Sequence, residues 1–354
     1  MERTVAHVDM DAFYASCHIR ETPDIKGLPV IIGGDPEKGR GVVTTCSYEA
    51  REYGIHSAMP ISRAFQLCPG GVYLRPDFQL YKSVSENVMG ILAQFADVFQ
   101  RAGIDEAYLD VTRRVTQYQT PYHFAQAVQH SILTHECITC SVGIAPSKSV
   151  AKIASDFRKP HGVTVVPQED VLSFLRPLPV EKISGVGKKT RQVLNDHGIT
   201  TIEQLEKTDV AQLERILGKS GSWLWVVANA KDERPVGYRG SVHSMGKEHT
   251  FAKDTKNVQD IFNAVEWIAE RLARRLHQRT MEFRTVSVKV RLKEFRTYNR
   301  SRTLPYHVDG KDVIIAVSRE LFQEFRGEYI RLLGIRLTNL RATKTYQETL
   351  LQWF

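Results

Sequence analysis

The sequence predicts an α+β protein built from several domains. At 354 residues the chain is longer than one hydrophobic core usually serves, so two or more domains are expected. Short apolar runs typical of strands alternate with helical stretches through the first half, whereas residues 167–232 show only helical patterns joined by short loops. Strand and helix patterns alternate again in the last third of the chain.

The first half contains the strand-like runs VAHVDM, LPVIIGG, AYLDV, CSVGIA and GVTVV. Helices are expected at 86–100 and 121–135. This alternation fits either an α+β or an α/β arrangement of the first half. Two acidic clusters fall at the ends of strand-like runs in this region, and they are the most informative feature of the chain.

The first acidic cluster, in HVDMDAFYAS, contains Asp9 and Asp11, and the second, in GIDEAYLD, contains Asp105 and Glu106. Apolar and aromatic neighbours surround both, and a buried carboxylate is too costly to keep unless a cation or hydrogen bonds compensate it. Carboxylates from separate segments make a Mg²⁺ site suited to phosphoryl or nucleotidyl transfer. Either cluster alone would more often be a solvated face or a helix cap, so other residues must decide.

Composition indicates an intracellular, soluble protein, with 42% hydrophobic and 25% charged residues. No basic start is followed by an apolar run, and no stretch of 18 or more apolar residues occurs, so we expect neither secretion nor a membrane partner. The odd number of cysteines forms no disulfide framework. The lone pair Cys137 and Cys140 lacks the second ligand pair that a structural zinc needs.

The basic charge is concentrated in one segment. Residues 241–346 contain 21 Lys and Arg against 12 Asp and Glu, whereas the formal net charge of the whole chain is +8. Such a segment indicates a polyanion partner, with nucleic acid favoured over an anionic membrane. The polar stretch KDERPVGYRGS at 231–241 has the composition of a tether between domains.

The basic segment predicts one sheet with helices on one face. An amphipathic helix and a second helix from about 310 to 325 are expected, the latter before a strand around GIRLTNL. In RTVSVKVRL valines alternate with polar residues, so Lys289 and Arg291 share one strand face. The order β-α-β-β-α-β leaves the opposite sheet face basic and exposed. The apolar positions of the first helix are Val258, Ile261, Val265, Ile268, Leu272 and Leu276.

Glycines and basic residues indicate a helix-hairpin-helix in ISGVGKKT. Gly185 and Gly187 precede a helix whose first turn holds Lys188 and Lys189. Glycines let a phosphate approach the backbone, and the N–H groups at a helix start bind it without discriminating between DNA sequences. A lone G-x-G also fits a plain turn, but the helical surroundings and the two lysines favour a phosphate contact.

Basic and hydroxyl side chains in two other segments suit a triphosphate. TTCSYEAREYGIHSAMP places Tyr48 and Arg51 close to Thr44 and Thr45, and SVGIAPSKSVAKIASDFRKPHG adds Lys148, Lys152 and Lys159. An Arg and a Lys from different segments near a metal site offset the charge that develops on a leaving pyrophosphate. Taken singly, Arg51 would more often make a surface ion pair and the lysines would be solvated.

Together the motifs VDMDAFYAS, SYEAREYGI, GIDEAYLD, SVGIAPSKSVAKIASDFRKPHG and ISGVG are highly specific, and the full chain resembles the Y-family of translesion DNA polymerases, in particular its DinB-like branch. The resemblance implies a right-hand polymerase that binds primer-template DNA and dNTP. Its implied domains are a palm at 1–17 and 76–166, fingers at 18–75, a thumb with the helix-hairpin-helix at 167–232, a linker at 233–243 and a βαββαβ little finger at 244–341.

The resemblance also implies residue roles at the catalytic site. Asp9, Asp105 and Glu106 match the ligands of two Mg²⁺ ions, and the Met10 carbonyl matches a ligand of the nucleotide-side ion. Asp11 is not expected to bind metal. The triphosphate-binding positions of the family correspond to Thr45, Tyr48, Arg51 and Lys159. Phe13 and Tyr14 match the pair beneath the sugar, which makes Tyr14 the expected steric gate.

Positions expected to contact DNA lie in two regions. Gly185, Gly187 and Lys188 belong to the hairpin, and Lys289 and Arg291 to the basic sheet face. In the little finger, Arg331 and Arg336 match positions that face the template backbone.

Two residues depart from the family pattern. Gly103 stands where many relatives have Ser, and Ala12 replaces an aromatic residue. Neither change removes an expected ligand.

The last eight residues, QETLLQWF, resemble the sliding-clamp peptide of archaeal and eukaryotic systems. The pattern Q-x-x-L-x-x-W-F comprises Gln347, Leu350, Trp353 and Phe354. A short terminal helix that packs these aromatics onto its own domain is the alternative. The polar lead-in TKTYQ favours a tethered anchor for a PCNA-like clamp.

The expected function is template-directed, low-fidelity DNA synthesis for translesion replication by a monomer in the cytoplasm. Two alternatives remain: a nucleotidyl cyclase, which can share a palm-like metal site, and a non-catalytic DNA-repair scaffold. A cyclase has no use for the hairpin, the basic domain or the clamp peptide. A scaffold has no use for Asp9, Asp105 and Glu106 together with Lys159.

Overall fold

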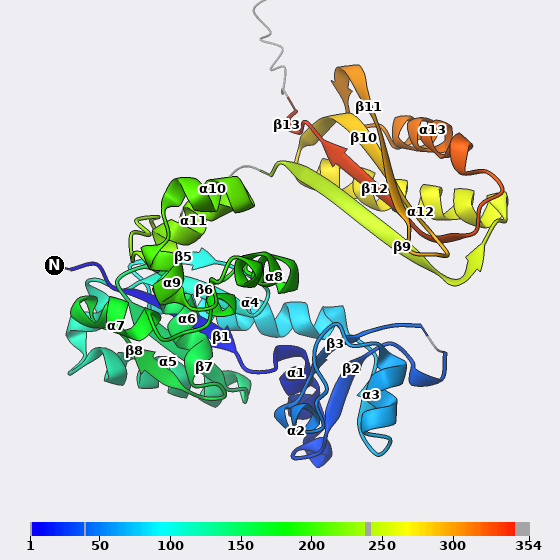
Figure 1. Ribbon diagram of the computed structural model, residues 1–354. Helices are drawn as coiled ribbons and strands as arrows, with labels where there is room; N and C mark the ends of the chain where they lie inside the picture. Colours follow the sequence, from blue (N-terminus) through cyan, green and yellow to red (C-terminus); the bar gives the residue numbers. More distant parts are fainter. Residues whose placement is uncertain (1, 39, 238–241, 344–354) are drawn as a thin grey trace, which may run out of the picture. The chain divides into compact units, whose positions relative to one another are not determined.

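A computed structural model describes residues 2–38, 40–237 and 242–343 (Figure 1). The chain forms two compact units, which divide between residues 238 and 239. Within the described ranges no helix is both long and apolar enough to cross a membrane. The expected clamp-binding residues 347–354 lie outside the described residues.

The first unit is built on a five-stranded sheet of order β5-β6-β1-β7-β8. The central strand β1 pairs antiparallel with both β6 and β7, so of the two arrangements left open for the first half the structure has α+β. The strands are β1 Val5–Met10, β5 Val98–Arg101, β6 Glu106–Asp110, β7 Cys140–Ala145 and β8 Val163–Val165.

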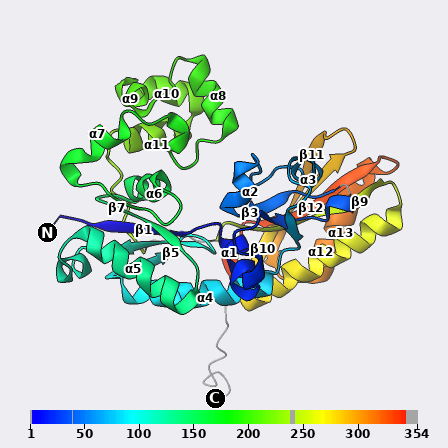
Figure 2. The ribbon, with the colours of Figure 1, turned by 90° about the horizontal axis from the view of Figure 1, so that it is seen from below.

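Helices cover both faces of this sheet (Figure 2). The helices α4 Phe78–Gln94 and α5 Pro121–Glu136 pack on the face formed by Ala6, Val8 and Met10 of β1. The helix α6 Lys148–Phe157 packs on the other face, because successive residues of a strand point to opposite sides. The polar residues of β1, His7 and Asp9, therefore lie against α6.

The helix expected at 86–100 was placed wrongly. It begins eight residues earlier, at Phe78, where the Asp77 side chain caps it by accepting hydrogen bonds from the Gln79 and Leu80 amides. It ends at Gln94, and Val98–Arg101 forms strand β5, which pairs with β6. The apolar pattern of 88–99 spans both elements and hides the change of period.

A smaller three-stranded sheet of order β3-β2-β4 lies within the first unit. Its core contains Ile31, Val43 and Ile61. Its strands are β2 Val30–Gly33, β3 Val43–Cys46 and β4 Val72–Leu74, and α1 Phe13–Glu21, α2 Tyr48–Glu52 and α3 Ile61–Leu67 accompany them.

Residues 171–228 are helical, as predicted, and share a core with α6 that includes Val171, Leu194 and Leu224. The helices are α7 Val171–Leu175, α8 Lys188–Asp196, α9 Ile202–Lys207, α10 Val210–Leu217 and α11 Lys219–Ala228.

The segment after α11 lies against the first unit as far as residue 237. The buried Asp232 carboxylate accepts hydrogen bonds from the Ser149 amide and hydroxyl at the start of α6. Val236 is buried, and the Gly237 amide donates to Gln100 Oε1 over 3.1 Å. Four residues of the 231–241 stretch, 238–241, are outside the described ranges.

The second unit is a four-stranded sheet of order β11-β10-β12-β9 with two helices, and the predicted order β-α-β-β-α-β is confirmed. A short strand, β13, is added to β10. The predicted helix face is buried except at Val258, which is 36% exposed. The elements are β9 Ser244–Thr255, α12 Val258–Gln278, β10 Met281–Leu292, β11 Thr297–Val308, α13 Lys311–Phe322, β12 Ile330–Thr338 and β13 Arg341–Ala342.

Candidate active site

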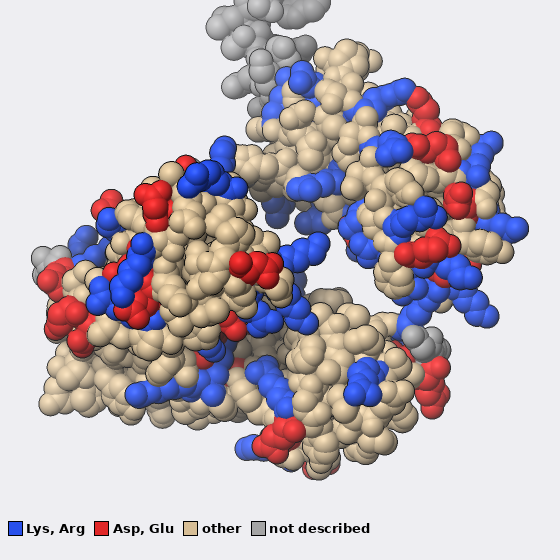
Figure 3. Space-filling model, viewed as in Figure 1, with Lys and Arg blue, Asp and Glu red and all other residues tan. Residues whose placement is uncertain are grey.

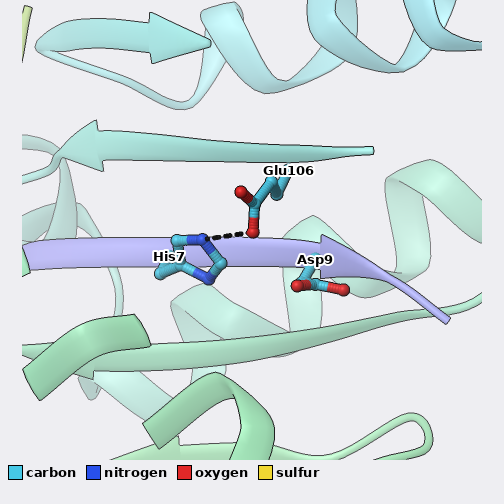
Figure 4. Close-up of side chains that lie close together, drawn as sticks. All are labelled: His7, Asp9 and Glu106. Carbon is cyan, nitrogen blue, oxygen red and sulfur yellow. Dashed lines mark ion pairs between the residues drawn. The ribbon is translucent and has the colours of Figure 1, made fainter. Parts of the chain in front are cut away.

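The pairing of β1 with β6 brings the two acidic clusters together. The strand register places Asp9 opposite Glu106, and the Met10 amide donates a 2.9 Å hydrogen bond to the Asp105 carbonyl. Figure 4 shows the Asp9 and Glu106 side chains beside His7. Residues nearly a hundred positions apart in the sequence therefore share one site.

Two lysines compensate the carboxylates. Lys152 Nζ donates to Asp9 Oδ2 over 2.7 Å and to Glu106 Oε2 over 2.8 Å. Lys159 Nζ donates to the other Asp9 oxygen over 2.6 Å and contacts Asp156 Oδ1 at 2.8 Å. Both lysines come from the α6 region, which packs on the polar side of β1. The motif SVGIAPSKSVAKIASDFRKPHG contains both lysines, but their contacts with the carboxylates depend on the packing of α6 against β1.

His7 is a member of the site that the sequence did not single out. Its side chain is fully buried, with Nδ1 2.8 Å from Ser155 Oγ and the ring centroid 4.6 Å from that of Tyr108. Its Nε2 lies 3.3 Å from Glu106 Oε2 (Figure 4). Burial lowers the pKa of His7, which disfavours the protonated imidazole.

The pKa values of the adjacent carboxyls move in opposite directions. Contact with His7, together with the Lys152 ammonium, lowers the pKa of Glu106. Burial, together with the charge of Asp9, raises the pKa of Asp105. The carboxylates around Lys152 raise its pKa although burial opposes this shift. The site therefore stabilises the ionised form of Glu106 and disfavours that of Asp105.

The donor set fits a hard divalent cation. Within the described ranges, His7, Asp9 and Glu106 offer possible ligand atoms that all lie within 4.8 Å of one another. Two carboxylates close together suit Mg²⁺, which prefers oxygen ligands. The Asp105 carboxyl is not in this group, although its main chain is bound to Met10.

Asp11 has a different environment from Asp9. It is 2% exposed, and its two carboxylate oxygens accept hydrogen bonds from Ser141 Oγ at 2.8 Å and from the His161 amide at 2.9 Å. Protein donors satisfy this carboxylate, which ties the end of β1 to β7 and to the residues after α6. That Asp11 does not bind metal stays a prediction.

Gly103 lies against the second acidic cluster. Its amide donates to the Glu106 carbonyl over 3.0 Å. A Cβ at this position would lie 3.0 Å from Glu106 Cγ and 3.2 Å from Asp105 Oδ1, which is close for a carbon neighbour. The missing side chain therefore gives both acidic residues room at the start of β6.

The Tyr14 ring stacks on a residue of α4 that the sequence analysis did not single out. Its ring stacks on Tyr81 of α4, with centroids 4.0 Å apart and planes at 14°. The hydroxyl of the fully buried Tyr81 lies 2.9 Å from His18 Nε2. Phe13 is buried beside Tyr14, 5.7 Å away between centroids. Both residues begin α1 directly after the Asp9 strand.

The expected triphosphate residues of the smaller sheet lie on β3 and α2. Thr45 pairs with Ile32 in that sheet, and Ser47 caps α2 by accepting from the Ala50 amide. The Arg51 guanidinium lies 4.3 Å from the Tyr48 ring centroid. Burial raises the pKa of the Tyr48 hydroxyl.

The glycine-rich turn before α8 has the backbone of the expected hairpin. Gly185 has φ +98°, a conformation that glycine adopts without strain. Gly187 is the N-cap of α8, so no side chain caps the helix that Lys188 begins. The first-turn amides are therefore not covered by a capping side chain.

Several cations of the second unit lie on the sheet face opposite the helices. On β10, Lys289 contacts Glu248 of β9 at 2.8 Å, and Arg291 donates to Thr297 of β11 over 2.9 Å. Arg336 of β12 donates to Ser244 Oγ over 2.8 Å. Figure 3 shows Lys and Arg side chains spread over much of the visible surface of this unit.

Sequence profiles identify the same three regions. The impB/mucB/samB family matches residues 8–156, the HHH motif of the IMS family matches 168–199, and the C-terminal domain of the impB/mucB/samB family matches 242–350. These matches cover the acidic clusters, the hairpin and the basic sheet. The chain therefore combines the impB/mucB/samB domain that carries the acidic clusters with the HHH motif and the C-terminal domain of the same family.

Curated relatives define the family more closely. DNA polymerase IV 2 of Methanosarcina mazei is 44% identical over 96% of this chain and 93% of its own length. DNA polymerase IV of Methanoculleus marisnigri is 43% identical, with 99% and 98% of the two chains covered. DNA polymerase IV of Exiguobacterium sibiricum is 41% identical, with 96% and 95% covered.

Solved structures agree with this assignment. A Y-family DNA polymerase chimera of Dbh and Dpo4 matches with a TM-score of 0.86 at 28% identity, over 96% of this chain and 99% of that one. An insertion ternary complex of Dbh DNA polymerase matches over the same shares, with a TM-score of 0.68 and 28% identity. The chain belongs to the DinB-like branch of the Y-family DNA polymerases.

Proposed function

We infer that the protein is a template-directed DNA polymerase for translesion synthesis. It adds a deoxynucleotide to a primer 3′-hydroxyl and releases pyrophosphate. The observation that carries this conclusion is the cluster of Asp9 and Glu106 across the β1–β6 pair, compensated by Lys152 and Lys159 within a Y-family fold. Low fidelity belongs to the same proposal, because it follows from the resemblance to translesion enzymes.

In this proposal Asp9, Asp105, Glu106 and the Met10 carbonyl hold two Mg²⁺ ions. When bound, the ions supply activation of the 3′-hydroxyl and stabilisation of the leaving pyrophosphate. The chain supplies ionised carboxylates at fixed positions, since Glu106 is kept in its charged form by His7 and Lys152. We assign His7 a positioning role, because its buried side chain lies 3.3 Å from Glu106 on the sheet face that they share with Asp9.

We assign the triphosphate to Thr45, Tyr48, Arg51 and Lys159. Lys159 already binds a carboxylate oxygen of Asp9, so its ammonium is available next to the catalytic carboxylates. A cation at that position offsets negative charge on the phosphates. Phe13 and Tyr14 would lie beneath the sugar, and the stack of Tyr14 on Tyr81 supports a rigid steric gate.

For DNA we propose two contact regions. Gly185, Gly187 and Lys188 bind one phosphate backbone, and the basic face with Lys289, Arg291, Arg331 and Arg336 binds another stretch of it. The proposed domain bounds are palm 1–17 and 76–166, fingers 18–75, thumb 167–232, linker 233–243 and little finger 244–341. These contacts are with phosphates, so affinity should depend strongly on salt and little on sequence.

We further propose that residues 347–354 anchor the enzyme to a PCNA-like sliding clamp. The spacing of Gln347, Leu350, Trp353 and Phe354 supports this, since it places the apolar members on one side of a helical turn. A tether raises the effective concentration of enzyme at the primer without changing the catalytic site. We also propose that the enzyme is a monomer and acts in the cytoplasm.

Primer extension with dNTP and Mg²⁺ tests the central proposal. The polymerase assignment requires templated extension of a labelled primer by the full chain. A nucleotidyl cyclase would instead convert a free nucleotide without a primer, and a scaffold would bind DNA without extending it.

For the clamp, deletion of 347–354 should leave clamp-independent extension unchanged and remove stimulation by the clamp. Stimulation that persists would place the contact elsewhere.

A further inference from the structure

The turn between β10 and β11 carries an exposed phenylalanine in a left-handed conformation. Phe295 has φ +64° and is 62% exposed. The turn is closed by hydrogen bonds from the Phe295 amide to the Leu292 carbonyl at 3.0 Å and from the Leu292 amide to the Arg296 carbonyl at 2.9 Å. Glycine or asparagine is preferred at such a position, because a bulky side chain strains the backbone there.

An exposed ring in a strained turn does not stabilise the fold. Phe295 is outside the hydrophobic core of the second unit, and its backbone conformation costs free energy. A residue that adopts an unfavourable backbone conformation without a gain in packing is expected to have a functional role. The side chain of Phe295 therefore calls for a role outside folding.

Basic side chains surround this ring and a second exposed aromatic residue. The Arg331 guanidinium lies 4.3 Å from the Phe295 centroid and 4.0 Å from Asp254 Oδ1. Tyr329, which is 48% exposed, has Lys256 Nζ at 5.5 Å and Lys293 Nζ at 5.9 Å from its ring. We call this group, Phe295, Tyr329, Lys256, Lys293 and Arg331, the aromatic–basic tip.

Aromatic rings beside cations are the chemistry that binds single-stranded nucleic acid. Unpaired bases stack on exposed rings, and cations bind the phosphates between them. The tip is also continuous with the proposed DNA face, since Arg331 belongs to β12, as does Arg336. A base inside a duplex has both faces covered by its neighbours, so an unpaired strand is the better occupant.

We propose that the aromatic–basic tip binds the unpaired template strand, with the Phe295 ring stacked on a base and the cations on its phosphates. This inference rests on the proposed polymerase function and extends it to a contact with the single-stranded part of the substrate. A protein segment is the competing occupant, and the test below separates the two.

The test measures the affinity of the full chain for two DNAs at the same ionic strength. One is a blunt duplex, and the other is the same duplex with an unpaired 5′ template extension that contains 2-aminopurine. The extension should tighten binding and quench the fluorescence of a stacked 2-aminopurine. Phe295→Gly should reduce this gain by at least about fivefold, the lower end of base–aromatic stacking, and should leave blunt-duplex affinity unchanged.

Two further variants are controls for the aromatic character and the position of Phe295. Phe295→Trp should retain the gain, because it preserves an aromatic face. Tyr306→Ala removes an aromatic residue of similar exposure, 69%, from the far end of β11 and should also retain it. The thermal midpoint of Phe295→Gly should be unchanged or raised, since glycine relieves the left-handed strain. A lower midpoint would overturn the argument from strain.

Failure of the tip proposal can be distinguished from failure of the proposed polymerase function. A wild-type enzyme that extends primers but gains no affinity from the extension would overturn the tip proposal alone. A Phe295→Gly enzyme that keeps the full gain would overturn the proposal and leave a protein segment as the occupant to test. A wild-type enzyme that binds but does not extend primers would contradict the proposed function instead.

Discussion

The carboxylate site of the first unit and the basic face of the second use the same kind of ion pair in different surroundings. The Asp9 and Lys152 side chains are 11% and 18% exposed, whereas those of Lys289 and Glu248 are 32% and 47% exposed. Solvent and salt screen the second pair much more than the first. The same N–O distance, 2.7 or 2.8 Å, therefore has different energetic consequences in the two units.

This difference matches the roles that we propose for the two regions. A catalytic site needs charges at fixed positions, which burial and neighbouring hydrogen bonds provide. A surface that binds DNA phosphates, as proposed for the basic face, needs many weak contacts that exchange readily with salt ions. We therefore expect single substitutions to be severe in the carboxylate site and mild on the basic face.

The largest effect is expected from Glu106→Ala. Removal of this proposed metal ligand should abolish primer extension, because the metal-dependent step would lose a carboxylate ligand. Primer-template affinity, measured by fluorescence anisotropy without dNTP, should stay within about twofold, because the DNA contacts lie elsewhere. Extension close to the wild-type rate would contradict the metal-ligand assignment.

The second effect is that of salt on DNA affinity. If the four cations Lys289, Arg291, Arg331 and Arg336 each neutralise one phosphate, affinity should fall about a hundredfold between 50 and 200 mM salt. Titrations with DNAs of unrelated sequence should give the same slope. A slope near zero would show that the basic face does not bind phosphates.

A third effect concerns Tyr14, whose position is fixed by its stack on Tyr81. Tyr14→Ala should relax discrimination against ribonucleotides by more than about tenfold, which corresponds to about 1.4 kcal/mol. Base selection should change less, because the proposed contact is with the sugar. Single-turnover incorporation of rNTP and dNTP provides the measurement, and an unchanged ratio would place the gate at another residue.

A smaller effect is expected for one cation of the basic face. Arg336→Ala should weaken DNA binding a few-fold and reduce the salt slope by about one. Arg274 of α12 is a matched control, since it is also exposed but lies on the helical side and pairs with Glu270. Arg274→Ala should leave both quantities unchanged. Equal effects of the two substitutions would mean that net charge, rather than the sheet face, governs binding.

The smallest effects are opposite shifts in thermal stability at two adjacent residues, measured in EDTA at neutral pH. Glu106→Gln should lower the midpoint by roughly 2–4 °C, because the folded state stabilises this carboxylate. Asp105→Asn should raise it, because burial and Asp9 disfavour the ionised Asp105. Shifts of the same sign would contradict the charge distribution described for the site.

The same pKa shifts predict the pH dependence of stability. The folded-state pKa of Glu106 is lowered, so its stabilising contribution is present above the unfolded pKa and is lost as pH falls through the folded value. The folded-state pKa of Asp105 is raised, so its destabilising contribution disappears as pH falls through that value. Midpoints of Asp105→Asn and wild type should therefore converge on acidification.

Local sequence patterns predicted most elements of the second unit. Period-two alternation in RTVSVKVRL and a helical apolar period in 258–276 appear as β10 and α12. The boundary of α4 could not be read in this way, because an apolar run continued from helix into strand. The cap at Asp77 decided the start, and pairing with β6 decided the end.

The sequence by itself determined which residue types form the candidate active site. Two acidic clusters at strand ends, with apolar neighbours and lysines elsewhere, predict carboxylates that need cations. Strand alternation also implies that His7 shares a face with Asp9, two residues later. Residue type and local period depend only on neighbours in the chain, so they are available without the fold.

Only the tertiary structure decided which groups meet. The register of β1 with β6 sets Asp9 opposite Glu106, and packing of α6 on β1 brings Lys152 to both carboxylates and Ser155 to His7. The platform of Tyr81 under Tyr14 is a contact of the same kind. These contacts join residues 46 to 148 positions apart, and such distances are set by packing of whole elements rather than by local preference.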